Sequence, residues 1–353
     1  MMGTKTKAIV TVVALACACG VPAFLPAYQV TVATTTAIFA IFALGLSLPM
    51  RHGGLPSLGH AAFYGVGGYA VALLTLHGVT NMALSILVAV AASTLFALVV
   101  GPILLRTRAD YFLMATLAVG QILFNLTQRF TEVTGGENGI TGMTAASVFG
   151  VNLGERTNFY YLSLVTLVAV AILVGALARA PFGHLLRAGR DSAKRTSALG
   201  VNVYRTNLTA LLWSAPISGL AGALASYQSG FVTPEAFSVA TSGAAFLMVA
   251  VGGPAFVAGP ILGAIVIEGL SGVLSLYTDR TNLILGLVYV VIALRVWRAF
   301  TKSSIGKRVT SRVSRLVKRR AEPDQPDGPV VAQQANDQLA PEHESASTRR
   351  SES

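Results

Sequence analysis

Long apolar runs recur along most of this chain, and they limit the folds that are open to it. The sequence is 53% hydrophobic and only 12% charged, whereas a soluble globular chain carries roughly 25% charged residues. Seven of its fifteen acids lie after Arg320. Apolar runs of about 20 residues are long enough to cross a bilayer as helices. The sequence therefore predicts an all-α polytopic membrane protein.

Ten membrane spans are predicted from these runs, and two regions among them are unusual. Gly53–Gly78 and Ser238–Gly269 are dense in glycine and proline. The helices there are expected to be broken or re-entrant, which is tolerated where protein or a water-filled cavity surrounds the backbone. The ten predicted spans are Ala8–Ala27, Val30–Met50, His60–His77, Met82–Leu104, Tyr111–Gln128, Phe159–Ala178, Asn207–Gln228, Thr241–Val257, Gly259–Tyr277 and Leu283–Val296.

The first run has a second interpretation. It could be a cleaved signal peptide, because Ala16-Cys17-Ala18 resembles a small-residue cleavage site. Its length and the span that follows at once favour a membrane helix. Cys17 and Cys19, the only two cysteines, are two residues apart on this helix and do not face each other. Neither a disulfide nor a metal site is therefore expected.

Lysine and arginine collect in alternate loops, which predicts the orientation through the positive-inside rule. With ten spans, both termini lie in the cytoplasm, and the Arg129–Asn158 loop and the Thr278–Asn282 turn lie on the opposite side. The formal net charge of +11 is thus a topology signal, and no nucleic-acid binding is expected. The basic residues assigned to the cytoplasm are Lys5, Lys7, Arg51, Arg106, Arg108 and those of Pro181–Thr206 and Arg298–Arg320.

Three regions follow from the changes in composition. Residues 1–300 form the membrane domain. Residues 301–320 form a basic juxtamembrane segment that is expected to lie against anionic lipid headgroups. Residues 321–353 are polar, with almost no large apolar side chains. Such a segment cannot bury enough surface to offset its ordering entropy, so it is predicted to be a disordered tail.

The most polar interval between the spans is Pro181–Thr206, which carries five basic residues against the single acid Asp191. Its middle part, His184–Leu199, has few helix breakers and predicts one or two short helices. A membrane protein that keeps such a segment between spans presents it to something in the water phase. Residues 181–206 are therefore the candidate site for a soluble partner.

The sequence lacks the motifs of an enzyme or an ATPase. It has no G-x-x-x-x-G-K-[ST] phosphate loop, no H-E-x-x-H zinc motif and no G-x-S-x-G nucleophile elbow. An ion-driven carrier usually places carboxylates within its spans, and here Glu268 is the one acid well inside a predicted span. For Glu268 we favour a position near a helix end or facing a polar cavity over a coupling role. These absences favour a pore-forming subunit that a partner drives.

Small residues are concentrated in Ser57–Tyr69, SLGHAAFYGVGGY, where they allow close helix packing. This stretch resembles the permeases of branched-chain amino-acid ABC transporters, of the LivM type that carries an Asp-Tyr-Phe motif. The resemblance runs in order from about Leu44 to Leu294. The other stretches that carry it are Arg108–Leu117, Thr134–Ile140, Pro181–Val203, Ser218–Leu224, Gly230–Glu235 and Gly259–Ala264.

This resemblance implies a heterodimer of two related permeases, two cytoplasmic ATPase subunits that bind the ATP, and an extracytoplasmic substrate-binding protein, in a bacterial cytoplasmic membrane. The chain itself would need no cofactor. Implied ATPase-coupling residues are Arg187, Arg190, Asp191, Ala198, Leu199 and Gly200. Implied translocation-path residues are Ser57, Gly59, His60, Phe63, Tyr64, Asn125, Gly252 and Gly253. Implied binding-protein docking residues are Gly135, Gly136, Glu137 and Asn138.

Two departures from the family pattern bear on the substrate. Leu55 and Pro56 stand where the family usually has Gln-(Leu/Ile), and its later Gly-Gly-x-Gly-(Ser/Thr) pattern becomes Gly252-Gly253-Pro254-Ala255-Phe256. The loss of an amide and a hydroxyl at these positions would make the translocation pathway less polar. Permeases for urea or short-chain amides have similar motifs and remain an alternative, as does an ion-coupled secondary carrier. A purely structural role would be favoured if deletion left amino-acid transport untouched.

Overall fold

A bundle of antiparallel and parallel helices forms the part of the chain that our computed structural model describes, namely residues 20, 22, 26–79, 81–107, 109–143, 153–252, 257–274 and 286. These residues belong to one unit, Met1–Ala293. The long helices, with the π-helical turn η1 that continues α2, are α2 (Ala27–Ser47), η1 (Leu48–His52), α4 (Met82–Leu104), α5 (Ala109–Arg129), α7 (Arg156–Arg179) and α10 (Val203–Ser229).

Four of these helices are long and apolar enough to cross a membrane: Ala27–His52, α4, α7 and α10. Together with the shorter apolar helices they confirm a polytopic membrane protein. The predicted first and last spans, the basic juxtamembrane segment and the polar tail lie outside the described residues apart from isolated positions, and the predicted total of ten spans stays a prediction.

Capping residues determine where several of the helices begin and end. The side chain of Asn81 accepts a hydrogen bond of 3.2 Å from the backbone N–H of Leu84, so α4 begins at Met82. Asn202 does the same for Arg205 at 3.0 Å, at the start of α10. Gly230 ends α10 in a left-handed conformation, with a φ of 76°, which glycine adopts without steric cost.

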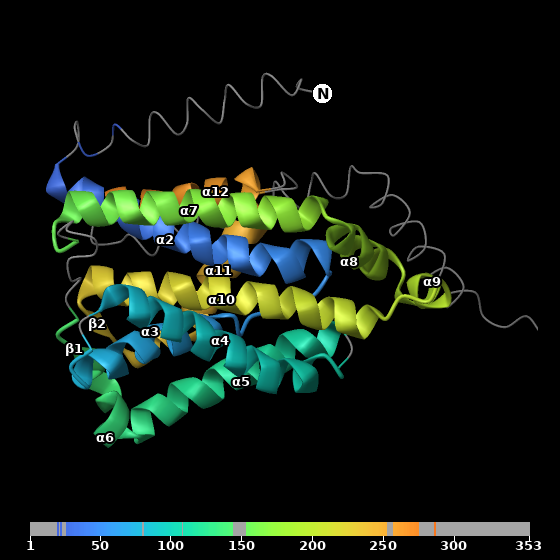
Figure 1. The fold of residues 1–353 in the computed structure, drawn as a ribbon, viewed down its shortest axis with the longest axis horizontal. Helices are drawn as coiled ribbons and strands as arrows, with labels where there is room; N and C mark the ends of the chain where they lie inside the picture. The colour runs from blue at the N-terminus through green and yellow to red at the C-terminus, as the bar shows by residue number, and fades with distance from the viewer. Residues whose placement is uncertain are drawn as a thin grey trace, which may run out of the picture. The chain divides into compact units, whose positions relative to one another are not determined.

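The bundle has two distinct ends (Figure 1). The α8 end carries the two short helices α8 (Pro181–Asp191) and α9 (Ala193–Ala198). The β end carries two antiparallel two-residue strands that pair Ile140 with Val232. Its elements are α6 (Thr131–Thr134), η2 (Gly136–Asn138), β1 (Ile140–Thr141), β2 (Phe231–Val232) and η3 (Pro234–Phe237).

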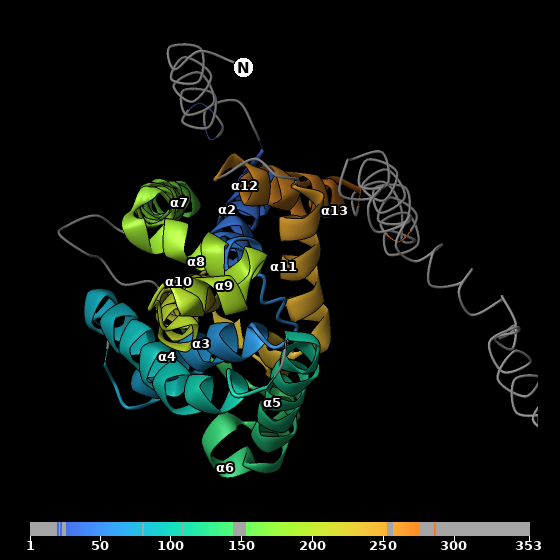
Figure 2. The same cartoon turned by 90° about the vertical axis from the view of Figure 1, so that its right-hand side faces the viewer.

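Helices α2, α3 (Ala61–Leu76) and α10 form the centre of the bundle. In Figure 2, viewed nearly along the helices, α10 lies between α2 and α4, with α3 beside it. A glycine brings the backbones of α3 and α10 into direct contact, because a Cβ on Gly222 would collide with the backbone carbonyl of Tyr64. Close approach of this kind is typical of helix packing in membranes, where dispersion contacts hold helices together.

Two helices begin inside the bundle. Ser93, at the middle of α4, donates a hydrogen bond of 3.1 Å to the carbonyl of Phe63, so α3 starts about halfway along α4. The backbone N–H of Ala61, at the start of α3, donates to Oγ of Ser242 in α11 (Val239–Val251) at 2.9 Å. Non-helical backbone leads into α3, and a short strand and the 3-10 turn η3 lead into α11. Irregular backbone or a 3-10 turn therefore precedes each helix, whereas α3 and α11 are themselves continuous, and that they are broken or re-entrant stays a prediction.

One predicted span is longer than the helix that the structure contains. The Thr241–Val257 prediction extended past Val251, where α11 ends, and residues 253–256 lie outside the described set. The chain then resumes with α12 (Ala258–Ala264), the π-helical turn η4 (Ile265–Gly269) and α13 (Leu270–Leu274). Together these three elements match most of the predicted span Gly259–Tyr277.

Candidate functional site

The polar segment 181–206 contains two short helices before α10 begins, and one or two were predicted for His184–Leu199. Pro181 occupies the first position of α8, where its missing N–H costs nothing. Leu186 is fully buried, and its Cδ1 packs close to Gly53 after η1. Ser192 caps α9 by accepting from the backbone N–H of Arg195. The segment is thus seated on the end of α2 and α7.

Two of the predicted coupling arginines bind this chain's own backbone. Arg187 donates to the carbonyls of Gly183 at 3.0 Å and Ala178 at 2.9 Å, and so caps the end of α7. Arg190 donates to the carbonyl of Arg51 in η1. Its ion pair with Asp191, at 3.4 Å, is solvent-exposed on both sides and is worth little by itself. Both arginines therefore attach α8 to the spans.

The free tip of the segment is Ala198, Leu199 and Gly200, all three exposed. Leu199 is 84% exposed, the highest value among the large hydrophobic side chains of the described residues. Gly200 has a φ of +83° with nothing near its missing Cβ. Leu199 is therefore an apolar side chain that is exposed to solvent on a basic segment.

A buried polar network joins three helices beside the start of α3. Ser214 donates to the carbonyl of Gly45 at 2.6 Å, so its oxygen must accept from His60 Nε2, 2.5 Å away. Nδ1 of His60 then accepts from Ser57 Oγ at 3.2 Å. This fixes the tautomer, because a hydroxyl has one hydrogen to donate. His60 is fully buried and holds α2, α3 and α10 together.

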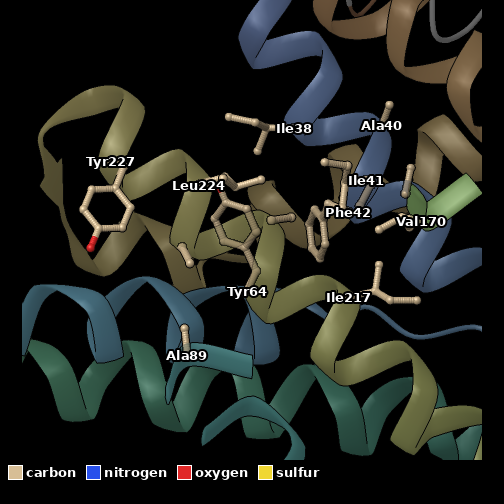
Figure 3. Close-up of a cluster of buried hydrophobic side chains, with 14 of the residues drawn as sticks. Ile38, Ala40, Ile41, Phe42, Tyr64, Ala89, Val170, Ile217, Leu224 and Tyr227 are labelled. Carbon is tan, nitrogen blue, oxygen red and sulfur yellow. The ribbon is translucent and has the colours of Figure 1, made fainter. Parts of the chain in front are cut away.

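A cavity of 170 Å³ opens between α2, α3, α10 and η3 near the β end. Phe39 and Tyr64 stack there, with ring centroids 6.2 Å apart. Figure 3 shows Tyr64 beside Phe42 of α2, at 4.9 Å between centroids. The residues that line the cavity are Phe39, Tyr64, Gly68, Ala225, Ser226, Ser229, Phe231, Val232, Thr233, Glu235, Ala236 and Thr241.

The predicted path residues therefore do not form one surface. Tyr64 borders the cavity, whereas Phe63 turns the other way and packs with Ala97 and Leu211. Ser57 and His60 belong to the buried network, and Gly59 lies against the backbone of Thr116. Gly252 touches the backbone of Gly259 at the end of α11. Asn125 is exposed on α5, and Gly253 lies outside the described residues.

The predicted docking loop is at the β end. Gly135 and Gly136 both have positive φ, 74° and 61°, and a Cβ on Gly135 would collide with the carbonyl of Gly139. Glu137 and Asn138 are exposed. The pairing of β1 with β2 fixes this loop next to the cavity mouth, a relationship that the sequence did not indicate.

Sequence reasoning missed several residues of the cavity and the network. Phe39, Ser229, Glu235 and Thr241 line the cavity, and Ser214 links His60 to α2. The sequence signal that could have identified these residues was weak. Hydroxyl side chains inside apolar helices often bond their own backbone, as Ser226 does, so their presence alone does not identify a site.

Long apolar helices, shorter apolar helices meeting inside the bundle and a basic segment at one end define a polytopic membrane protein. The chain belongs to the family described as branched-chain amino acid transport system / permease component, which matches residues 28–296.

Individual relatives agree with this assignment. The chain is 32% identical to the high-affinity branched-chain amino acid transport system permease protein LivM of Salmonella typhimurium, over 76% of this chain and 68% of the relative. The Escherichia coli LivM protein has the same identity and coverage. A probable branched-chain amino acid transport permease protein LivH of Methanocaldococcus jannaschii is 28% identical, over 68% of this chain and 78% of the relative.

Proposed function

We propose that this chain is a permease subunit of an ABC importer that moves branched-chain amino acids across the bacterial cytoplasmic membrane. Separate ATPase subunits would bind and hydrolyse the ATP. The observation that carries the proposal is the α8–α9 segment, a basic cap attached to the spans by Arg187 and Arg190, with an exposed apolar tip at Leu199. Membership of the permease family supports it.

The charge distribution supports an orientation for the bundle. The α8 end is basic and is assigned to the cytoplasm by the positive-inside rule, while the β end carries most of the described acids. This assignment agrees with ten spans and two cytoplasmic termini. Apart from Glu268 in η4, the described charged residues are Arg51, Arg106, Asp110, Arg179, Arg187, Arg190, Asp191, Lys194, Arg195 and Arg205 at the α8 end, and Arg129, Glu132, Glu137, Glu155, Arg156 and Glu235 at the β end.

The contacts of the segment suggest how ATP-driven motion reaches the spans. The tip around Leu199 would sit in a groove of one ATPase subunit and move with it. Arg187 and Arg190 would carry that motion to α7 and η1, because their hydrogen bonds end on backbone carbonyls of those elements. The stretch Gly59–Tyr69 follows η1 in the chain and contains the start of α3. The start of α3 would therefore move when η1 moves.

A second permease subunit would pack against α5. Gln121, Asn125 and Gln128 are spaced i, i+4 and i+7, which places them on one helix face; Asn125 is exposed there and the two glutamines are partly exposed. Amides are costly in contact with lipid tails and are usually covered by protein. Large apolar side chains are also exposed on α4 and α7, as Leu95 and Ile172 illustrate.

An extracytoplasmic binding protein would dock on the β end, where Gly135–Asn138 projects beside the cavity mouth. A passive connector is the alternative role for this loop. Crosslinking from a cysteine at Glu137 distinguishes the two: adducts with the loaded binding protein support docking, and their consistent absence counts against it.

The coupling proposal is tested with Leu199→Ser in the assembled transporter. The tip variant should reduce co-purification of the ATPase subunits and abolish ATP hydrolysis stimulated by the loaded binding protein. Leu98→Ser is the matched control, because Leu98 is also an exposed apolar residue but lies within α4, away from both the tip and the proposed docking loop. If both variants retain wild-type association and stimulated hydrolysis, the coupling assignment is wrong.

The substrate is tested separately by competition. Excess unlabelled leucine, isoleucine and valine should each suppress uptake of labelled leucine, whereas urea and acetamide should not. Suppression by urea or acetamide alone would favour the short-amide alternative within the same family.

A further inference from the structure

Arg51 binds two separate parts of the chain at the α8 end of the bundle. Its backbone belongs to η1, and its carbonyl accepts the hydrogen bond from Arg190 of α8. Its guanidinium reaches α11, where Nη2 donates a hydrogen bond of 3.3 Å to the carbonyl of Val249. One residue thus binds α8 through its main chain and α11 through its side chain.

The carbonyl that this guanidinium binds lies in the last turn of α11, which ends at Val251. The last four carbonyls of an α-helix have no partner within the helix. An arginine side chain can bind them, and its charge opposes the partial negative charge of that helix end. The partly buried side chain of Arg51 therefore holds the end of α11 next to η1.

The same guanidinium lies against the start of α12. A Cβ placed on Gly259 would be 2.8 Å from Nη1 of Arg51 and would also meet the carbonyl of Gly252. Further along α12, a Cβ on Gly263 would collide with the carbonyl of Met248. Glycines four residues apart let two helices pack backbone to backbone. The end of α11, the start of α12 and Arg51 therefore pack together, and both helices contact α2 (Figure 2).

The other end of α11 reaches the cavity of 170 Å³. Thr241 lines that cavity, and Oγ of Ser242 accepts from the backbone N–H of Ala61 at the start of α3. Between its two ends α11 is a continuous helix of 13 residues, a length of roughly 20 Å. Rigid secondary elements can carry a displacement from one site to another. A displacement at Val249 would therefore reach the wall of the cavity.

We propose that Arg51 is the positioning residue that passes movement of α8 to α11 and, through α11, to the cavity. The inference rests on the proposed function and adds a second route from the coupling segment, besides the one through the start of α3. Arg190 holds the carbonyl of Arg51, so movement of α8 displaces η1. The guanidinium then moves the end of α11 and the start of α12 together with η1.

The test uses the complete transporter in proteoliposomes with its loaded binding protein, and it measures leucine delivered per ATP hydrolysed. Arg51→Gln removes the guanidinium but keeps the backbone carbonyl that Arg190 binds. This variant should retain stimulated ATP hydrolysis and deliver about fivefold less leucine per ATP, within the usual range of coupling between two sites. Arg51→Lys, which keeps the charge, should recover part of the loss. Arg106→Gln is the control, because Arg106 is exposed at the same end, and it should leave the ratio unchanged.

A double-mutant cycle with Arg190→Ala tests whether the two arginines act in one route. If they do, the chain with both Arg51→Gln and Arg190→Ala should deliver about as little leucine per ATP as the poorer single variant, because residues that act together are not additive. Losses that multiply would mean independent effects and would overturn the proposal. A lower unfolding midpoint of Arg51→Gln with an unchanged ratio would also overturn it, because a purely structural contact gives that result.

The movement is also measurable with Arg51 in place, which keeps the proposal falsifiable if Arg51→Gln fails to assemble. Spin labels at Leu95→Cys in α4 and Leu262→Cys in α12, both exposed positions, report the distance between these helices in a chain that also carries Cys17→Ser and Cys19→Ser. The distance should change when a non-hydrolysable ATP analogue binds the ATPase subunits. An unchanged distance would overturn the proposal.

Failure of this inference is distinguishable from failure of the proposed function. If the wild-type complex shows no ATP hydrolysis stimulated by the binding protein, the importer assignment itself is wrong. If the wild type is coupled and Arg51→Gln delivers as much leucine per ATP, only the role of Arg51 is wrong.

Discussion

Nε2 of His60 and Oγ of Ser214 lie 2.5 Å apart, and this contact joins the start of α3 to α10 inside the bundle. Ser214 extends the link to α2 through the carbonyl of Gly45. Hydrogen bonds are stronger in a low-dielectric interior than in water, and an unpaired group there is correspondingly costly. The network should therefore contribute mainly to stability.

Replacing His60 by alanine should lower the stability of the protein by about 2–4 kcal/mol, because it leaves a cavity and removes the partner of two buried hydroxyls. The measurement is the midpoint of thermal unfolding in detergent. His77→Ala is the control, since His77 is exposed at the end of α3 and should change stability by less than about 0.5 kcal/mol. Equal midpoints for the two variants would contradict the role of the network.

Gly222→Ala should separate α3 from α10. The added methyl group would collide with the backbone carbonyl of Tyr64, and backbone cannot move aside as a flexible side chain can. We expect a loss of about 1–3 kcal/mol, the usual effect of overpacking, and a lower yield of folded protein. Gly243→Ala, in α11, has open space at the same atom and should be tolerated. A stable Gly222→Ala protein would mean that the helices are not in backbone contact.

Arg190→Ala should uncouple the transporter without detaching the ATPase subunits. The change removes the hydrogen bond to the carbonyl of Arg51 but leaves the tip at Leu199 intact. We predict retained co-purification and retained ATP hydrolysis, with leucine uptake at least about fivefold lower, which corresponds to roughly 1 kcal/mol of lost coupling. Arg106→Ala, also exposed at the α8 end, should keep wild-type uptake. Loss of ATPase binding in Arg190→Ala would instead make Arg190 a direct contact.

The face of α5 should crosslink to the second permease. In a background with Cys17 and Cys19 replaced by serine, Asn125→Cys should form adducts of heterodimer mass with a short bifunctional reagent. Leu95→Cys in α4 and Ile172→Cys in α7, both exposed on apolar faces, should not. Adducts from Leu95 or Ile172 and none from Asn125 would move the subunit interface elsewhere.

Much of the helical architecture is predictable because apolar run length largely determines it. The predicted span Met82–Leu104 coincides with α4, since Asn81 caps it at one end. The depth at which α3 and α11 begin was not predictable. It depends on a tertiary contact, the hydrogen bond between Ala61 and Ser242, between residues far apart in the sequence.

The role of each side chain was harder to predict from the sequence than the presence of the polar segment that contains it. The sequence indicates that Arg187 and Arg190 lie in a polar segment between spans, but in a sequence an arginine that binds its own chain's carbonyls looks the same as one that binds a partner. Phe63 and Tyr64 are neighbours in sequence and face different helices, because successive residues of a helix point about 100° apart. Six separate elements line the cavity, so no local pattern reveals it.

The most direct test of the central claim is leucine uptake into proteoliposomes that contain the complete transporter, with ATP held constant and the proton and sodium gradients collapsed by ionophores. An importer driven through α8 and α9 should keep its wild-type uptake rate under these conditions and lose it when ATP is withdrawn. Uptake that collapses with the ion gradients while ATP remains would contradict the account and identify an ion-coupled carrier.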